Sequence, residues 1–108
     1  FDEIDNLCHH IVAFDEGKPI GTCRFFKENN HYTIGRVAIL KEYRNQHIGN
    51  LLLKSAEKEI KKLNGDLIVV HAQVRVSPFY ENQGYIQFGQ IDDDEGVPHM
   101  WMKKKIQY

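Results

Sequence analysis

The sequence lacks the features that mark several large classes of protein. Its 14 basic and 15 acidic residues leave a formal net charge of −1, so it has no basic excess of the kind that gives affinity for a nucleic-acid backbone. Its apolar runs fall far short of the roughly 20 residues that a membrane-spanning helix needs. We therefore expect neither nucleic acid nor a membrane as a partner.

Cysteine is scarce and the usual metal-binding spacings are missing. Cys8 and Cys23 are the only 2 cysteines and form no CxxC pair, which excludes a disulfide framework and a cysteine-based zinc site. If residues 15–18 form a hairpin turn, Cys23 faces His10 rather than Cys8, and a bridge is not indicated. The 6 histidines show no HExxH-type spacing, so we expect no metal. With no signal peptide visible, a cytoplasmic location is the simplest interpretation.

Apolar periodicity and turn residues predict the main elements. Strands are expected at 9–14, 19–26 and 31–39, joined by turns at 15–18 and 27–30. Over residues 48–63 apolar side chains recur close to every 3.6 positions, which predicts a long amphipathic helix that ends at Asn64-Gly65. The nearly continuous apolar run at 66–73 predicts a strand buried on both faces. Residues 32–73 should therefore form a right-handed parallel βαβ unit.

Weaker signals complete the predicted fold. The segment 77–83 is predicted as a short helix with Ser77 as its cap. Two further strands are expected at 85–89 and 99–105, joined by an acidic loop at 92–98. The chain, residues 1–108, should thus be one domain of the α/β class (mixed α+β). It should have a mixed sheet of about six strands, one long helix and one short helix.

The start of the long helix has the composition of an anion-binding site. The first turn of a helix leaves about four N–H groups without intrahelical partners, and the helix dipole adds positive charge there. Arg44 supplies a forked donor suited to phosphate, and Gly49 lets a ligand approach the backbone. No acidic residue lies between Tyr43 and Ala56. A capped helix start without a ligand explains these residues equally well, and the lack of GK[ST] or GxGxxG disfavours a nucleoside triphosphatase or a dinucleotide enzyme.

The sequence resembles the GCN5-related N-acetyltransferase (GNAT) superfamily. The resemblance is carried, in this order, by GRVAI at 35–39, EYRNQHIGNLL at 42–52, FYENQGY at 79–85 and DEGVPHM at 94–100. Arg44 and Gly49 occupy the first and last defined positions of the family's pyrophosphate loop, [QR]xxGx[GA], and His47 stands where the motif has its first glycine. The last segment and the opening residues 1–5 resemble the ElaA-type branch. Such enzymes begin with a strand and two helices that line the acceptor site, so the resemblance implies that this segment is absent from the chain.

The resemblance implies an N-acetyltransferase that uses acetyl-CoA as co-substrate. A primary amine of a small molecule or peptide would attack the thioester directly in a ternary complex, so no enzyme nucleophile is required. Backbone groups would pair with the pantetheine arm and hold the pyrophosphate. The implied cofactor-binding residues are Val37, Ala38, Ile39, Arg44, Asn45, Gln46, His47, Ile48, Gly49 and Asn50.

The same resemblance implies a catalytic set. Tyr80 would be the general acid that protonates the departing thiolate, and the alternative is a core aromatic beside Phe79. Candidates for the base are His99, His71 and, through a chain of waters, Glu95. Gln73 would orient substrate or cofactor amides, or it is simply a satisfied strand-end glutamine. The acidic run at 92–95 would attract a cationic amine, or it is a solvated loop.

Two further functions compete with the enzyme. A non-catalytic acyl-CoA-binding module is motivated by His47 and by the segment implied to be missing. A nucleic-acid-binding domain could use the helix lysines, but the net charge disfavours it. A homodimer is compatible with the sequence.

Overall fold

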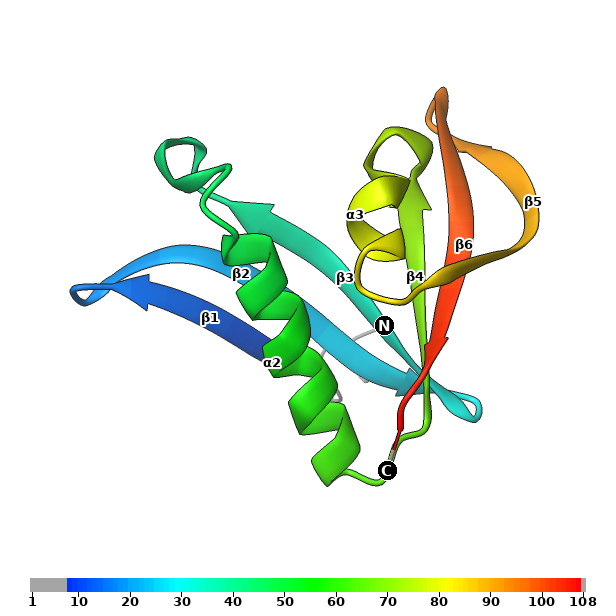
Figure 1. The fold of residues 1–108 in the computed structure, drawn as a ribbon, viewed down its shortest axis with the longest axis horizontal. Helices are drawn as coiled ribbons and strands as arrows, with labels where there is room; N and C mark the ends of the chain where they lie inside the picture. The colour runs from blue at the N-terminus through cyan, green and yellow to red at the C-terminus, as the bar shows by residue number, and fades with distance from the viewer. Residues whose placement is uncertain (1–7, 108) are drawn as a thin grey trace.

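The computed structural model describes residues 8–107, which form one mixed β-sheet covered by helices (Figure 1). The strands are β1 (His9–Asp15), β2 (Lys18–Glu28), β3 (His31–Ile39), β4 (Leu67–Gln73), β5 (Ile86–Asp94) and β6 (Val97–Lys105). The helical elements are the 3-10 turns η1 (Lys41–Tyr43) and η2 (Val74–Val76) and the α-helices α2 (Ile48–Lys62) and α3 (Ser77–Glu81). In Figure 1, α2 lies across β1 and β2, and α3 lies over β4.

The strand order is β1-β2-β3-β4-β6-β5, with β3 and β4 parallel and the other neighbours antiparallel. This confirms the predicted mixed α/β class, the six-stranded sheet and the parallel strand–helix–strand unit. The parallel pair sits in the middle of the sheet, where helices cover it, as parallel strands require.

Helix α2 forms because its apolar positions fall on one face. That face contributes Leu52, Leu53, Ala56 and Ile60, all at most 2% exposed, to the core. Burial of a leucine or isoleucine side chain contributes about 1.5–3 kcal/mol, so this face fixes the helix against the sheet. Within residues 8–107, no helix is long and apolar enough to cross a membrane.

The C-terminal end of α2 confirms the predicted stop at Asn64-Gly65. Asn64 adopts a left-handed conformation with φ of 65°, and Gly65 N–H donates to the Ile60 carbonyl over 2.9 Å. Gly65 is buried, and a Cβ there would lie 2.5 Å from a methyl carbon of Ile60. The glycine is therefore needed for space, and the asparagine supplies the positive φ that ends the helix.

Helix α3 corrects the predicted cap. The turn η2 runs directly into the helix, so Ser77 is already helical, with φ of −58° and ψ of −34°, and Val76 is the capping residue. No side-chain hydrogen bond caps the helix. The helix ends at Glu81, two residues before the predicted end at Gln83. A helical serine cannot cap its own helix, because the cap requires an extended backbone.

Two other local predictions were wrong. The acidic segment 92–98 is not a loop: β5 runs to Asp94, β6 begins at Val97, and only the two residues between them form the turn. The strand β5 is at the sheet edge and exposed, so its carboxylates stay in water while the backbone pairs. Cys23 pairs with Ile11 rather than His10, because a bulge at Ile20 in β2 shifts the register by one residue.

Candidate functional site

The site is a gap in the middle of the sheet. The parallel strands β3 and β4 pair only as far as Ile34 and Val70, and then diverge. Beyond that point β3 stays paired with β2 as far as Ile39, and β4 with β6 as far as Gln73, so the edges that face each other have no strand partner. A cavity of about 880 Å³ opens between these edges, the first turn of α2, and α3. Unpaired strand edges can bind an extended chain that carries amides.

The first turn of α2 brings backbone donors to one end of this cavity. The first hydrogen bond of the helix runs from Leu51 N–H to the His47 carbonyl over 3.2 Å. Within residues 8–107, the amides of Ile48, Gly49 and Asn50 have no hydrogen-bond acceptor. All three residues line the cavity. These amides and the positive end of the helix dipole lie where the sequence predicts anion binding.

The loop before α2 takes the backbone form that a glycine would favour. Asn45 and His47 have φ of 66° and 63°. When left-handed residues alternate with residues of negative φ, successive N–H groups point toward one place and form an anion-binding concavity. His47 therefore preserves the conformation expected of the glycine that it replaces in the motif. Asparagine and histidine are among the residues that adopt this region most readily.

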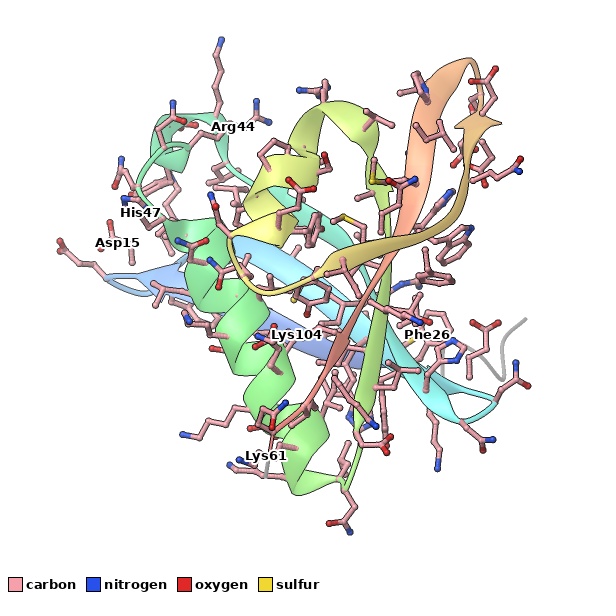
Figure 2. All side chains as sticks on the ribbon, turned by 45° about the vertical axis from the view of Figure 1, so that its right-hand side comes forward. Asp15, Phe26, Arg44, His47, Lys61 and Lys104 are labelled. Atoms are coloured by element: carbon pink, nitrogen blue, oxygen red, sulfur yellow. The ribbon has the colours of Figure 1, made fainter. Side chains whose placement is uncertain are left out.

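Two side chains of the loop brace it rather than line the cavity. Arg44 Nε donates to the Ile39 carbonyl over 3.2 Å, and Gln46 Nε2 donates to the Glu42 carbonyl over 3.2 Å. Figure 2 shows Arg44 and His47 beyond the N-terminal end of α2, at the opposite end of the helix from Lys61. Of the predicted cofactor-binding residues, the cavity lining contains Val37, Ile39, Asn45, His47, Ile48, Gly49 and Asn50 but not Ala38, Arg44 or Gln46.

Gly49 has a different role from the one its sequence context indicated. A Cβ at this position would lie 3.3 Å from Phe79 Cζ and 3.5 Å from Ile39 Cδ1. The missing side chain thus allows α2 to approach α3 and β3 closely, which closes one wall of the cavity. The sequence analysis expected the missing Cβ to leave room for a ligand, but a Cβ at this position would point toward Phe79 and Ile39.

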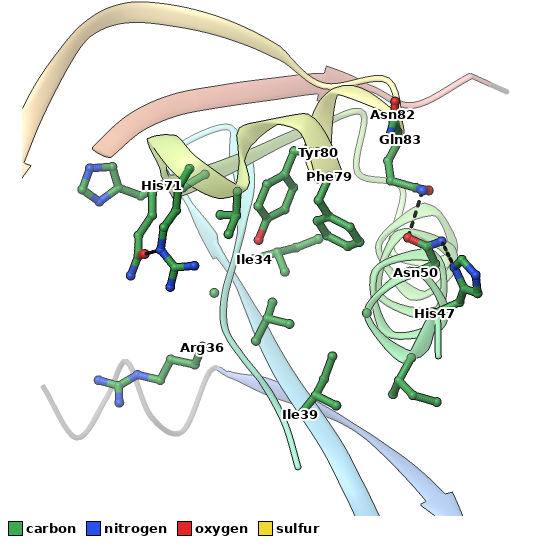
Figure 3. Close-up of a pocket in the computed structure, with 18 of the residues that line it drawn as sticks. Ile34, Arg36, Ile39, His47, Asn50, His71, Phe79, Tyr80, Asn82 and Gln83 are labelled. Carbon is green, nitrogen blue, oxygen red and sulfur yellow. Dashed lines mark hydrogen bonds between the residues drawn. The ribbon is translucent and has the colours of Figure 1, made fainter. Parts of the chain in front are cut away.

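A chain of side-chain contacts ties this end of the cavity together (Figure 3). Gln83 Nε2 donates to Asn50 Oδ1 over 3.1 Å, and Asn50 Nδ2 lies 3.5 Å from His47 Nδ1. The chain links the loop, the first turn of α2 and the segment after α3. It therefore holds the three open amides in place relative to the rest of the cavity.

We expect the melting temperature to separate two substitutions of His47. In His47→Gly, relief of a left-handed residue that costs about 1–2 kcal/mol is offset in part by the freer unfolded chain, worth about 0.4–1 kcal/mol, so the melting temperature should stay the same or rise. In His47→Val, a β-branched residue is forced into the same backbone region, and the value should fall by several degrees. Differential scanning calorimetry measures both. Equal melting temperatures would contradict the left-handed assignment.

Tyr80 stands in the middle of the cavity. The residue is 9% exposed, and its ring lies edge-on to Phe79, with centroids 5.0 Å apart, and to Tyr85, 5.7 Å apart. Figure 3 shows its hydroxyl pointing into the cavity. Burial, and to a lesser degree the nearby Cys23, raises the pKa of Tyr80 above its ordinary value of 10.0. The phenol therefore remains protonated at neutral pH and can donate a hydrogen bond.

Two histidines meet on the β4–β6 side of the cavity. Their rings lie 4.7 Å apart, and both His71 and His99 line the cavity. His71 Nε2 is 3.1 Å from Asp92 Oδ1, and its ring stacks on Trp101 at 4.3 Å. His99 Nδ1 is 2.9 Å from the Val97 carbonyl. A carbonyl only accepts, so Nδ1 carries the N–H of this contact, and in the neutral ring the lone pair is on His99 Nε2.

Of the remaining predicted residues, Gln73 lines the cavity and Glu95 does not. Gln73 lines the cavity, and its Oε1 accepts from Arg75 Nε over 3.0 Å. Glu95 lies in the exposed turn between β5 and β6 and is not part of the lining. The structure adds lining residues that were not among the predicted site residues, and they include Arg36, Arg75, Phe79, Asn82 and Gln83. Within residues 8–107, no three His, Cys, Asp or Glu side chains converge as metal ligands would.

Comparison with known families decides the class of protein. The family model described as the acetyltransferase (GNAT) domain matches residues 2–106. The chain belongs to the GNAT acetyltransferase family. Relatives of this GNAT chain include the uncharacterized N-acetyltransferase YjcF of Bacillus subtilis, 31% identical over 104 residues that cover 95% of the chain and 74% of YjcF. Protein ElaA of Escherichia coli is 22% identical over 109 residues, which cover 97% of the chain and 71% of ElaA.

Solved structures share the GNAT fold. An acyl-CoA N-acyltransferase from Pseudomonas aeruginosa superposes with a TM-score of 0.84 at 23% identity, covering 96% of this chain and 76% of that one. An aminoglycoside 6'-N-acetyltransferase complexed with coenzyme A also reaches 0.84, at 17% identity, and covers 96% and 76%. Escherichia coli ElaA reaches 0.82 at 21% identity, with 90% and 67% covered. At these identities the likeness concerns the fold, and the family match identifies the chain as a GNAT-type transferase.

Proposed function

We propose that the protein transfers an acetyl group from acetyl-CoA to a primary amine of a small molecule or peptide. The observation that carries this proposal is the convergence of three features on one cavity. They are the open amides of Ile48, Gly49 and Asn50, the unpaired edges of β3 and β4, and the hydroxyl of Tyr80. Each feature matches one part of a thioester cofactor.

The first two features would hold coenzyme A. Its pyrophosphate would accept hydrogen bonds from the three open amides, where the helix dipole favours negative charge. Its pantetheine arm carries amides, which would pair with backbone groups of β3 near Val37 and Ile39 as an added strand does. A protein of the same fold forms a complex with coenzyme A, which supports coenzyme A as the ligand.

The chemistry requires only proton transfers from the protein. The acceptor nitrogen attacks the thioester carbon, a C–N bond forms, and the C–S bond breaks. Tyr80 would donate its phenolic proton to the departing thiolate. His99 would take the proton that the amine loses, through the Nε2 that its Nδ1 contact with the Val97 carbonyl leaves open; His71, with Nε2 on Asp92, remains the second candidate through its Nδ1. Glu95 lies outside the cavity lining and is the weaker candidate.

The test is turnover by the protein with acetyl-CoA and a panel of primary amines, followed as release of free CoA thiol. We expect thiol release with at least one amine. We also expect CoA to raise the melting temperature more than pantetheine does, since only CoA carries the pyrophosphate. Thermal stabilisation by CoA without turnover across the panel would favour the alternative, a non-catalytic acyl-CoA-binding module.

A further inference from the structure

The cavity is lined by two arginines and by no acidic side chain within residues 8–107. Arg36 comes from β3, and Arg75 comes from η2, on the opposite side of the gap in the sheet. We propose that the acceptor amine also carries a carboxylate, which Arg36 and Arg75 bind. This substrate class rests on the proposed function and deepens it.

The backbone of Arg36 is unusual. The register between β2 and β3 shifts at this point, so β3 contributes one residue more than β2, and Arg36 has φ of 54°. The other non-glycine residues with positive φ in residues 8–107 lie in turns or at helix ends, and they are Glu16, Asn29, Asn45, His47, Asn64 and Glu95. A long arginine inside a strand is a costly occupant of this region, where glycine or asparagine would fit better. Strain of this kind is retained where the side chain is needed.

Arg75 is held in a fixed orientation. Its Nε donates to Gln73 Oε1 over 3.0 Å, which leaves its two terminal nitrogens without a protein partner in residues 8–107. Two terminal guanidinium nitrogens can bind both oxygens of one carboxylate. Gln73, predicted as a substrate-orienting residue, would then act by positioning Arg75.

The charge of this end of the cavity matches the proposed acceptor. Asp92 is the carboxylate that contacts the histidine pair, but it does not line the cavity and is occupied by His71 Nε2 at 3.1 Å. A purely cationic amine would therefore meet like charge without a counter-ion. An acceptor whose carboxylate is paired with the arginines has a counter-charge of its own, and its amine still lies close to the positive charge of Arg36 and Arg75. That positive charge lowers the pKa of the ammonium group and raises the share of free amine, which is the nucleophile.

The arginines do not belong to the pyrophosphate site. Figure 3 shows Arg36 and His71 on one side of Tyr80, and His47 and Asn50 on the other. The acyl group of the cofactor would lie near Tyr80, between the two ends. The acceptor must approach from the end opposite to the pyrophosphate, which is the end that holds the arginines.

The test compares α-amino acids with their carboxamides as acceptors. Each pair has nearly the same shape, and the amide removes the negative charge. Because the amide also lowers the pKa of the neighbouring amine, kcat/KM is compared per concentration of free amine. We expect kcat/KM to be about tenfold higher for the acids, the effect of one charge-assisted hydrogen bond at an open site. In Arg36→Gly, KM for the acids should rise about tenfold, while KM for the carboxamides and for acetyl-CoA stays unchanged. Arg75→Gln should act in the same direction.

Folding is separated from binding by the choice of variant. Glycine suits the backbone at position 36, so the melting temperature of Arg36→Gly should not fall. Lys58→Gln removes a positive charge from the exposed face of α2 and should leave KM for the acids and KM for acetyl-CoA unchanged. Acetylation of carboxamides and acids with equal kcat/KM, or an unchanged KM for acids in Arg36→Gly, would overturn the carboxylate assignment and leave the transferase intact. No turnover with any amine would overturn the proposed function, and this inference with it.

Discussion

Tyr80→Phe is expected to lower kcat by about tenfold to a few hundredfold, while KM for acetyl-CoA stays the same. The substitution removes only the hydroxyl that points into the cavity, and the ring keeps its contacts with Phe79 and Tyr85. Without that proton the thiolate must leave as an anion. The loss lies at the low end for general acid catalysis, because a phenol is a weaker acid than the thiol that it would form. Steady-state kinetics with thiol detection measures both constants.

The pH dependence follows from the same group. Burial raises the pKa of Tyr80 above its ordinary value of 10.0, so the phenol is protonated throughout the range in which the protein would be assayed. The acid form is present below this pKa and is lost only as the pH rises through it. No descending limb should therefore appear in kcat below pH of about 10. A limb at lower pH that persists in Tyr80→Phe would belong to another group.

Tyr85→Phe is the matched control for Tyr80→Phe. Its hydroxyl is also buried but donates to Glu57 Oε2 over 2.8 Å, and it does not line the cavity. Loss of this bond should cost about 1–3 kcal/mol and lower the melting temperature by several degrees. The kcat should remain unchanged. A fall in kcat of similar size in both variants would show that Tyr80 acts through packing rather than as an acid.

Asn50→Asp is expected to weaken CoA binding by about ten- to hundredfold without unfolding the protein. The new carboxylate has the shape of the amide and can still accept from Gln83, which donates to Asn50 Oδ1 over 3.1 Å in the structure. It places a negative charge in the first turn of α2, beside the amides proposed to hold the pyrophosphate. Repulsion between unit charges a few ångströms apart at a protein surface amounts to a few kcal/mol at most, which gives this range. Isothermal titration calorimetry with CoA measures the dissociation constant.

The control for Asn50→Asp is Asn64→Asp, and the helix dipole predicts opposite effects of the two variants on stability. A carboxylate in the first turn favours the helix by about 0.3–1 kcal/mol, so the melting temperature should stay equal or rise slightly while CoA affinity falls. Asn64→Asp adds the same charge at the other end of α2, where residue 64 already has a positive φ that aspartate tolerates. It should slightly lower the melting temperature and leave CoA affinity unchanged. Equal affinities in both variants would remove the pyrophosphate from the start of α2.

Sequence patterns predicted the local elements best where periodicity was strong. The helix over 48–63 and the strand over 31–39 were found within a residue of their ends, because burial imposes the apolar period. The acidic segment 92–98 was misjudged because aspartate is rare in strands, whereas an exposed edge strand leaves its carboxylates in water. The bulge in β2 that moved the partner of Cys23 by one position left no signal in composition.

The candidate site was predicted only in part. The loop at 44–50 could be found because helix starts and their motif are local in sequence. The direction of each side chain could not be predicted from the sequence. For this reason Gly49 was assigned to ligand access, although its Cβ would point at Phe79. Arg36 and Arg75 were missed because neither stands out in its own segment. They share a cavity only because β3 and β4 diverge after Ile34 and Val70.

By itself, the sequence determined the α/β class, the long helix and the family likeness, and it predicted an anion site at the start of that helix. These depend on periodicity, capping and short motifs, which act over a few neighbouring residues. The tertiary structure decided which edges of the sheet stay unpaired, which hydroxyl enters the cavity, and which charges line its far end. Those properties arise from residues distant in sequence, because strand register and bulges set them through long-range pairing.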